Sequence, residues 1–181
     1  MDEKQLVASV LSGDDGALRI FIGKYERLVA HMVARAVVND LDREELCQDV
    51  FIKIYEKLDT FHFNSKLSTW IATIAFRMAV NFAKKKKLDQ VDFDSVEFQI
   101  PDNVRSYEDE DLSRFVVKLV EQLPTNYKMV LTLFYLDGFN YPEIVEITGM
   151  PEGTVKNYLH RARGKLKVII EEHARKEIEL V

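Results

Sequence analysis

The 181-residue sequence contains a single cysteine, Cys47, and few glycines or prolines, 7 and 4 respectively. One cysteine excludes a disulfide within the chain and any zinc site built from several cysteines. Scarce glycine and proline favour long helices over a turn-rich β architecture. Apolar residues also recur at helical spacing through almost the whole chain. The sequence therefore predicts an all-α protein.

Long apolar runs are also lacking. No stretch approaches the roughly eighteen apolar residues that cross a bilayer. The N-terminus, MDEKQLVASV, is acidic and lacks the basic-then-apolar order of a signal peptide. We therefore expect a cytoplasmic protein with no membrane insertion. Hydrophobic residues make up 47% of the chain, enough for the core of one domain or two small ones.

Motifs for catalysis and cofactor binding are absent from the sequence. The four histidines, His31, His62, His160 and His173, are scattered, and Cys47 has no obvious base beside it. There is no glycine-rich phosphate loop and no paired-carboxylate motif. We expect a protein that is not an enzyme and that uses no cofactor, metal or small-molecule substrate.

The formal net charge is −5, but the two signs are segregated along the chain. Basic residues gather at 84–87 and 156–167, and acidic residues gather between these runs, at 89–111. The acidic segment shows no sustained helical period and contains Pro101, which is typical of a solvated linker. We therefore divide the chain into two small helical domains, residues 1–88 and 112–181, joined by an acidic linker at 89–111.

Four helices are expected in the first domain. Asp42 is the expected N-cap of the third helix, with Glu45 at the capping-box position. Ser68 or Thr69 is the expected N-cap of the fourth. The apolar stripes behind these helices cover residues 6–11, 18–33, 46–58 and 70–82.

The second domain is expected to end in a helix-turn-helix unit. Two helices in NYPEIVEITGMPEGTVKNYLHRA are separated by about four residues that include Gly149, which is the spacing of that motif. The expected helix boundaries are Pro124 as a first helical residue, Gly138 and Gly149 as C-caps, Asn140 with Glu143 as a capping box, and Pro151 at the start of the last helix.

The last helix carries a run of bases with no acid after Glu152. Its expected inner stripe is Val155, Leu159, Ala162 and Leu166. Its expected outer face is Lys156, Asn157, His160, Arg161 and Lys165, whose side chains have the donors to read base edges in a DNA major groove. Arg163 and Lys167 lie further round the helix and suit phosphates. The alternative is an ordinary solvated basic face.

These motifs together resemble a known family. A resemblance to region 4 of bacterial RNA polymerase sigma factors of the extracytoplasmic-function (ECF) type is carried by EIVEITGMPEGTVKNYLHRARGKL. A resemblance to the family segment just before region 4 is carried by LVEQLPTNYKMVLTLFYLDGFNYPEI. In the first domain, a resemblance to region 2.2 of the same family is carried by DREELCQDVFIKIYEKLDTF, and a resemblance to regions 2.3 and 2.4 by SKLSTWIATIAFRMAVNFAKKKK. The resemblance spans nearly the whole chain and has two separate motifs in the expected order.

The resemblance implies a promoter-specificity subunit of RNA polymerase. The first domain would bind the clamp helices of core RNA polymerase and open the minus-ten element, where it would contact the melted non-template strand. The second domain would lie near the polymerase flap and read the minus-thirty-five element of double-stranded promoter DNA. Such factors are commonly held by an anti-sigma factor, so the resemblance also implies that partner.

The resemblance implies residues for each surface. Those that match the polymerase-binding helix are Glu45, Gln48, Asp49, Phe51 and Ile52, of which Phe51 and Ile52 have a core residue as their alternative. Those that match the promoter-melting segment are Ser65, Lys66, Ser68, Thr69 and Trp70. The aromatic residues Trp70, Phe61 and Phe63 either stack on an unpaired base or belong to the core. The implied DNA-binding residues are Lys66, Trp70, Arg77, Asn81, Lys84, Lys85, Lys86 and Lys87 in the first domain, and Lys156, Asn157, Tyr158, His160, Arg161, Arg163 and Lys165 in the second.

Some of these positions depart from the family. Arg77 and Asn81 stand where the family usually has Asn and Asp, and Asn157 and Tyr158 stand where Ser and Arg are common. The promoter sequence is therefore not transferable from a relative. Two rival functions stay open: a helix-turn-helix transcription regulator with a ligand or phosphoacceptor site in its first domain, and a sigma-like interaction protein without promoter-opening activity.

Overall fold

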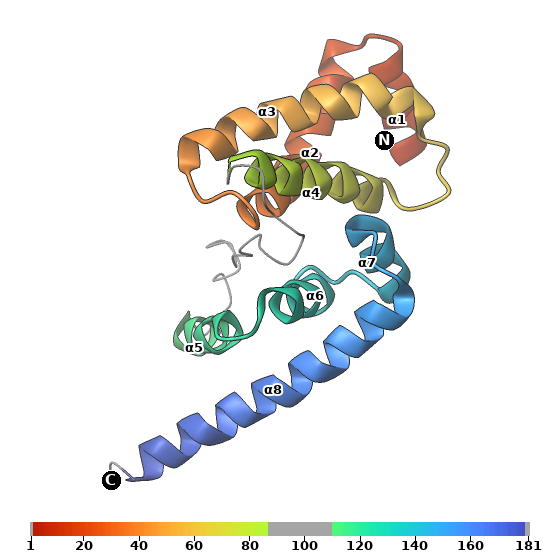
Figure 1. Cartoon of the computed structure of the whole chain (residues 1–181). Coiled ribbons are helices and arrows are strands. Elements are labelled where there is room, and N and C mark those ends of the chain that lie inside the picture. The colour runs from red at the N-terminus through yellow and green to blue at the C-terminus, as the bar shows by residue number, and fades with distance from the viewer. Residues whose placement is uncertain (1, 87–109, 180–181) are drawn as a thin grey trace.

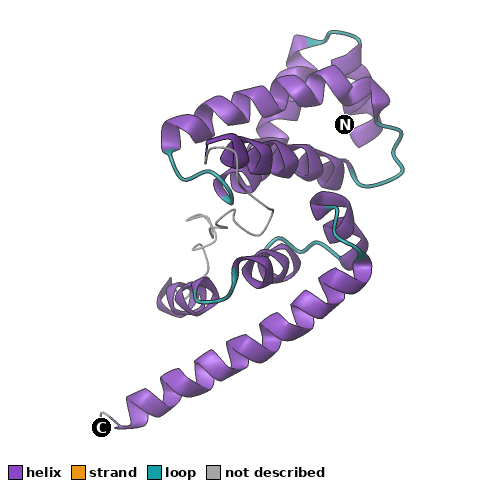
Figure 2. Cartoon of the chain, viewed as in Figure 1, coloured by secondary structure: helices purple, strands orange, loops and turns teal. Residues whose placement is uncertain are grey.

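The computed structural model describes residues 2–86 and 110–179 of the chain. Within these two ranges the regular secondary structure is helical, with no strand (Figure 2). The predicted all-α class is confirmed. Most of the predicted acidic linker lies outside the described residues, but a helix already begins at Glu110, two residues inside the predicted linker.

The first half of the chain is a bundle built around its second helix. Its elements are α1 (Glu3–Leu11), α2 (Asp15–Ala34), α3 (Asp40–Lys57), the short 3-10 helix η1 (Leu58–Thr60) and α4 (Leu67–Lys86). Helix α2 contacts α1, α3 and α4, and α3 also contacts α4 (Figure 1). Phe21, Val29, Ile54 and Ile71 are fully buried in this core. Burying each such side chain stabilises the fold by roughly 1.5–3 kcal/mol.

Two cap predictions for this bundle were wrong. Asn39, not Asp42, is the N-cap of α3, and its side chain accepts a hydrogen bond from the backbone N–H of Asp42 at 3.0 Å. Asparagine caps as well as aspartate does, so the helix starts three residues earlier than predicted. Helix α4 begins at Leu67, so Ser68 and Thr69 lie inside its first turn instead of capping it.

The second half of the chain is organised along one long helix. Its elements are α5 (Glu110–Glu121), α6 (Thr125–Tyr135), α7 (Tyr141–Thr148) and α8 (Glu152–Glu179). Helix α8 contacts each of the other three. At 1.5 Å per residue its 28 residues extend about 42 Å, well past the basic run. Val155, Leu159 and Ala162 are fully buried, which confirms these three members of the predicted inner stripe.

Both ends of α7 were predicted correctly. The side chain of Asn140 accepts from the backbone N–H of Glu143 at 3.0 Å, and the Glu143 carboxylate accepts from the Asn140 N–H at 2.8 Å. This reciprocal pair is the predicted capping box. Gly149 ends the helix at φ +74°, a left-handed conformation that glycine adopts without strain.

The boundaries of α6 differ slightly from prediction. Pro124 is the N-cap and the helix begins at Thr125. Leu136 is the C-cap, and Gly138 follows two residues later with φ +71°. Gly138 therefore belongs to the turn between α6 and α7, where the left-handed conformation redirects the chain.

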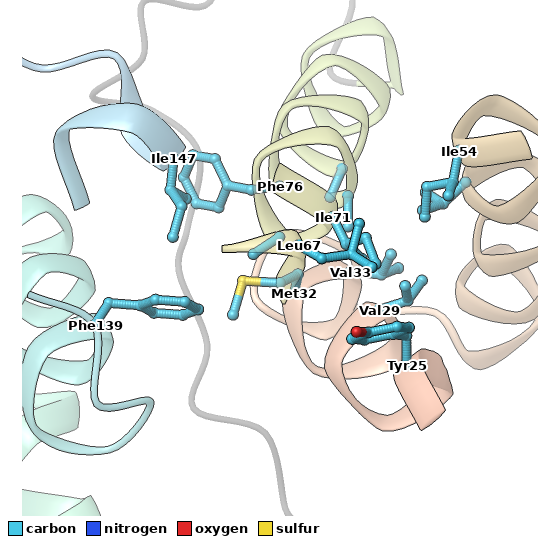
Figure 3. Close-up of a cluster of buried hydrophobic side chains, with 14 of the residues drawn as sticks. Tyr25, Val29, Met32, Val33, Ile54, Leu67, Ile71, Phe76, Phe139 and Ile147 are labelled. Atoms are coloured by element: carbon cyan, nitrogen blue, oxygen red, sulfur yellow. The ribbon is translucent and has the colours of Figure 1, made fainter. Parts of the chain in front are cut away.

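The two halves pack directly against each other. Helix α7 contacts α4, and the buried residues of both halves form one continuous hydrophobic cluster. Figure 3 shows the join: Phe76 of α4 lies beside Ile147 of α7, and Met32 of α2 faces Phe139. The sequence predicted two domains joined by a linker and did not predict this contact.

Candidate nucleic-acid and polymerase interfaces

The outer face of α8 is the first candidate surface. Asn157, His160, Arg161 and Lys165 are exposed, as predicted for a face that meets DNA. Lys156 is exposed too, and its ammonium lies 2.6 Å from Glu152 Oε1 one turn earlier. Because α7 and the Gly149 turn fix the start of this helix, its N-terminal half presents these donors from a rigid support.

Two predicted DNA-binding residues of α8 are placed differently. Tyr158 is half-buried, and its ring packs edge-on against Tyr127 with centroids 5.5 Å apart. Arg163 donates from Nε to the Tyr135 hydroxyl at 2.8 Å and lies over the rings of Phe134 and Tyr135. The Tyr158 ring therefore packs α8 against α6, whereas Arg163 contacts α6 and is still exposed, further round the helix as predicted.

An aromatic cluster marks the loop before α4. Trp70 is half-buried and packs on Phe61, with centroids 5.2 Å apart, and Phe61 packs on Phe63 at 4.7 Å. Phe61 is buried, while Phe63 is 37% exposed and has φ +56°. A left-handed aromatic residue is strained, and such strain gathers at functional sites. Phe63 is therefore the most exposed of the three rings and the one with a strained backbone.

The segment that is predicted to melt the promoter is in contact with α7. Lys66 Nζ lies 2.9 Å from Glu143 Oε1, and the buried Thr69 hydroxyl donates to the same oxygen at 3.2 Å. Ser65 Oγ donates to Glu146 Oε1 at 3.1 Å. Further along α4, Arg77 also donates from Nη2 to the Glu146 carbonyl at 2.9 Å. Four residues of this segment and of α4 therefore contact α7.

The Glu143 carboxylate is held in its charged form. Burial raises its pKa, but hydrogen bonds from the Asn140 backbone N–H, Lys66 and Thr69 outweigh burial and leave the pKa below its usual value. Three donors thus fix one carboxylate that joins the cap of α7 to α4.

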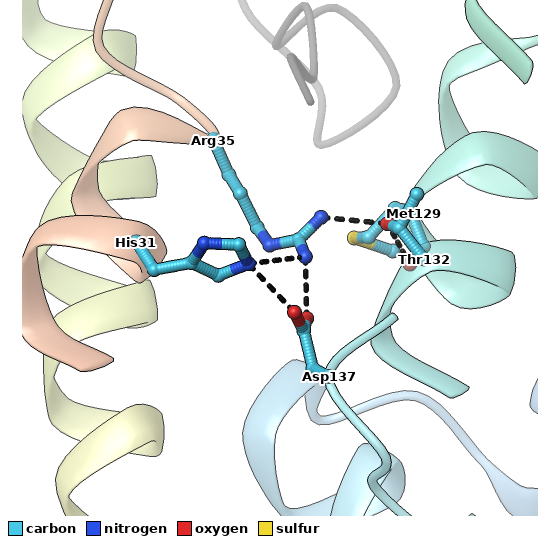
Figure 4. A network of polar contacts seen from close by, with 5 residues as sticks. All are labelled: His31, Arg35, Met129, Thr132 and Asp137. Atoms are coloured by element: carbon cyan, nitrogen blue, oxygen red, sulfur yellow. Dashed lines mark hydrogen bonds and ion pairs between the residues drawn. The ribbon is translucent and has the colours of Figure 1, made fainter. Parts of the chain in front are cut away.

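A second polar cluster joins the halves further along. Arg35, at the end of α2, is 1% exposed and forms an ion pair with Asp137, in the turn after α6 (Figure 4). Arg35 Nη1 also donates to Thr132 Oγ1 at 2.6 Å. His31 Nε2 lies 2.6 Å from Asp137 Oδ1 and 3.0 Å from Arg35 Nη2, so this one ring nitrogen faces both the carboxylate acceptor and the guanidinium donor.

The buried charge of Arg35 depends on its partners in this cluster. Burial lowers the pKa of its guanidinium, and the Asp137 carboxylate opposes that shift. An arginine stays charged in proteins, so a buried guanidinium needs its carboxylate partner. We call Arg35, His31, Thr132 and Asp137 the interdomain ion-pair cluster.

The basic end of α4 is partly engaged within the chain. Asn81, Lys85 and Lys86 are exposed and Lys84 is half-buried. Lys86 forms an ion pair with Asp42 of α3. Lys87, the fourth predicted lysine, lies outside the described residues.

The exposed face of α3 fits a protein partner. Glu45, Gln48 and Asp49 are exposed, and Ile52 is 59% exposed, which excludes the core alternative for that residue. Phe51 is half-buried and lines an apolar groove of about 260 Å³ between α1, α2 and α3, and other residues of its lining are Leu18, Ile22, Ile52 and Tyr55.

Neither a metal cluster nor a membrane span is found in residues 2–86 and 110–179. No group of three or more His, Cys, Asp and Glu in these ranges could hold a metal ion. None of their helices is both long and apolar enough to cross a membrane.

Comparison with known proteins agrees with this two-part layout. Residues 21–88 match the family described as Sigma-70 region 2, and residues 116–166 match Sigma-70, region 4. The ECF RNA polymerase sigma-E factor of Escherichia coli K12 is 32% identical over 90% of this chain and 91% of its own length. SigW of Bacillus subtilis, also an ECF sigma factor, is 31% identical over 91% and 94%.

The chain belongs to the ECF sigma factors. An ECF sigma factor binds core RNA polymerase and directs transcription initiation at specific promoters, and this is the function of the present chain. The predicted family and function are confirmed.

Solved structures share the fold of this sigma factor. CnrH, solved in complex with the cytosolic domain of CnrY, gives a TM-score of 0.64 at 18% identity over 94% of this chain and 97% of its own. The sigma factor RpoE of Bartonella quintana, solved with the anti-sigma factor NepR, gives 0.59 at 24% identity over 84% and 98%.

Sequence reasoning missed the residues that join the two halves of the sigma factor. Arg35 carried one signal, because it interrupts the otherwise apolar run MVARAVV and an isolated charge there must find a buried partner. Asp137 and Glu146 carried none, because their partners lie in the other half of the chain.

Proposed function

We propose that the N-terminal half of α8 reads the minus-thirty-five element through Lys156, Asn157, His160 and Arg161. The single observation that carries this proposal is the exposed row of donors on a helix whose opposite face is fully buried. Lys165 lies further along and is assigned to phosphates. Tyr158 and Arg163 support the helix from α6 instead of touching bases.

The first domain, residues 1–88, is assigned to polymerase binding and to the minus-ten element, and the second, residues 112–181, to the minus-thirty-five element. On α3, Gln48, Asp49 and Ile52 form the contact with the clamp helices, and the groove beside Phe51 accepts an apolar side chain of the polymerase. An isoleucine that is more than half exposed on such a face gains binding energy when a partner covers it.

The groove between α6 and α8 is assigned to the polymerase flap. Its volume is about 510 Å³, and Leu131, Tyr135, Leu166 and Ile170 line it. Ile170 and Tyr135 are about half exposed on this groove, so an apolar partner would bury them.

An anti-sigma factor and a cytoplasmic location complete the proposal. The structural relative from Bartonella quintana was solved with the anti-sigma factor NepR, which supports a partner of the same kind for this chain. RNA polymerase works in the cytoplasm, so a factor that binds it acts there. As a sigma factor the chain lends specificity to the catalytic activity of polymerase and needs none of its own.

Binding to fluorescently labelled bacterial core RNA polymerase tests the polymerase surface. Ile52→Ser removes apolar contact area and should weaken the affinity at least ten-fold, which corresponds to about 1.4 kcal/mol. Ile20→Ser is the matched control, because Ile20 is 55% exposed on α2 and lies outside the proposed interface. Equal affinities of the two variants would remove α3 from the polymerase interface.

A further inference from the structure

Helix α7 of the second domain lies against the promoter-facing surface of the first domain, where Thr69 is buried and Lys66 and Arg77 stay exposed. Lys66, Thr69 and Arg77 lie on or beside the segment that meets the minus-ten element, and each is bonded to Glu143 or to Glu146 of α7. The Glu143 carboxylate takes up an ammonium and a hydroxyl donor, which are the groups that a DNA phosphate would take. Helix α7 therefore occupies part of this surface in place of nucleic acid.

In this arrangement the two predicted DNA-binding surfaces are closer together than the two promoter elements are on DNA. Helix α7 contacts both α4 and α8, so the minus-ten and minus-thirty-five surfaces are separated by about one helix diameter, roughly 10–12 Å. The minus-ten and minus-thirty-five elements are about 25 base pairs apart, or about 85 Å at 3.4 Å per base pair. The chain cannot contact both elements in this arrangement.

We infer that the structure is a closed, self-inhibited state of the sigma factor, held shut by the interdomain ion-pair cluster and by the contacts of α7 with α4. Promoter recognition requires these contacts to break. The inference deepens the proposed function and rests on it for the identity of the covered surface.

The interdomain ion-pair cluster stabilises the closed state. Asp137 is 6% exposed at its side chain and lies between His31 and Arg35, both from α2. Opening returns Arg35 and Asp137 to water together, whereas removing either one leaves the other buried and unpaired in the closed state. The cluster therefore favours closure only while both charges are present.

The apolar part of the join lies between α2 and α4 of the first half and α7 with the turn before it in the second half. Phe76 and Met32 from the first half meet Ile147 and Phe139 from the second, while each half keeps its own buried residues on the remaining faces. Residues 87–109 connect the halves, and the covalent length of 23 residues allows a separation of up to about 80 Å. The connecting residues are therefore long enough for the two halves to separate.

A distance measurement on the whole chain tests the inference without polymerase. Spin labels at Asn64→Cys, beside Ser65, and Glu152→Cys, at the start of α8, both exposed positions, are placed in a Cys47→Ser background. The contact of Ser65 with Glu146 of α7 brings the two labelled sites near each other in the closed state. The distance distribution from electron spin resonance should be dominated by one short component. Asp137→Asn should raise the ratio of open to closed chains at least ten-fold, because it leaves Arg35 buried without its partner.

Two further variants serve as checks. Arg35→Gln removes the other charge and should open the chain as well, and Asp59→Asn, an exposed carboxylate on η1, should change nothing. Circular dichroism confirms that each variant keeps its helices. A long distance in the unmodified chain, or distributions of both Asp137→Asn and Arg35→Gln equal to that of Asp59→Asn, would overturn the closed state.

Adding core RNA polymerase separates this inference from the proposed function. The labelled chain should move to the long distance when polymerase binds. If Asp137→Asn opens the chain but polymerase neither binds nor changes the distance, the closed state stands and the proposed polymerase surface is wrong. If polymerase binds and the short distance persists in an active complex with promoter DNA, the inhibitory role is wrong.

Discussion

At the scale of single residues, Arg161 is the sharpest test of base reading. Arg161→Ala should cost about 1–3 kcal/mol in promoter binding if the guanidinium makes paired hydrogen bonds to a base edge, and the loss should fall on promoters with the preferred base. Binding of polymerase carrying the variant to a panel of minus-thirty-five sequences measures it. Arg175→Ala is the control, since Arg175 is also exposed on α8 but lies about four turns further on.

A uniform loss over all promoter sequences would instead mark Arg161 as a phosphate contact. The exposure of Arg161 was predictable from sequence, because the 3.6-residue period turns it away from Val155 and Leu159. Tyr158 shows the limit of that reasoning. Its neighbours on α8 are exposed, but its own ring meets Tyr127 of α6, and only the tertiary packing decides this.

Glu143 gives a pH-dependent prediction. Its pKa is lower in the folded chain than in the unfolded chain, so its contribution to stability is present above about pH 4.5 and is lost as the pH falls through the folded pKa. Glu143→Gln keeps the capping box and removes the charge, and it should lower the free energy of unfolding at pH 7 by about 1 kcal/mol.

Urea unfolding at several pH values checks this prediction. The difference between the native chain and Glu143→Gln should shrink as the pH is lowered below about 4.5. The variant Glu152→Gln, which loses a carboxylate exposed on α8, is the control and should stay within about 0.5 kcal/mol throughout, the usual range for surface changes. A difference that does not depend on pH would show that the Glu143 charge is not responsible.

At the scale of elements, the basic end of α4 should govern the salt dependence of promoter binding. Replacing Lys84, Lys85 and Lys86 by glutamine should flatten the log–log slope of affinity against salt by about 0.9 for each phosphate that is no longer neutralised. Lys86 also pairs with Asp42, so its contribution to the change in slope should be smaller than that of Lys85. Arg27→Gln, at an exposed position of α2, is the control. An unchanged slope would show that these lysines are not at DNA.

The helix boundaries show which local signals suffice. Asn140 with Glu143, and Gly149 in the left-handed conformation, were predictable because cap and turn chemistry depend only on neighbours in sequence. The start of α3 was not, because Asn39 and Asp42 are both good capping residues and local sequence does not choose between them.

At the scale of the whole molecule, the sequence predicted two helical domains but not their contact. Arg35 and Asp137 stand 102 positions apart, and no local pattern links them. Phe76 and Ile147 likewise have the apolar character of any core residue, and only the structure assigns them to the join between the halves. The surfaces for polymerase and for DNA are predictions from motifs, whereas no motif predicts the contact between the two halves.

The central claim is that this chain is a sigma factor that selects promoters. Its most direct test is transcription by purified bacterial core RNA polymerase from a library of DNA fragments with randomised sequences upstream of a fixed reporter, with and without the purified chain. We expect transcripts that depend on the chain and come from fragments sharing two sequence elements about 25 base pairs apart, the spacing that corresponds to about 85 Å of duplex. Transcription no higher than that of core polymerase alone, or transcripts with no shared elements, would contradict it.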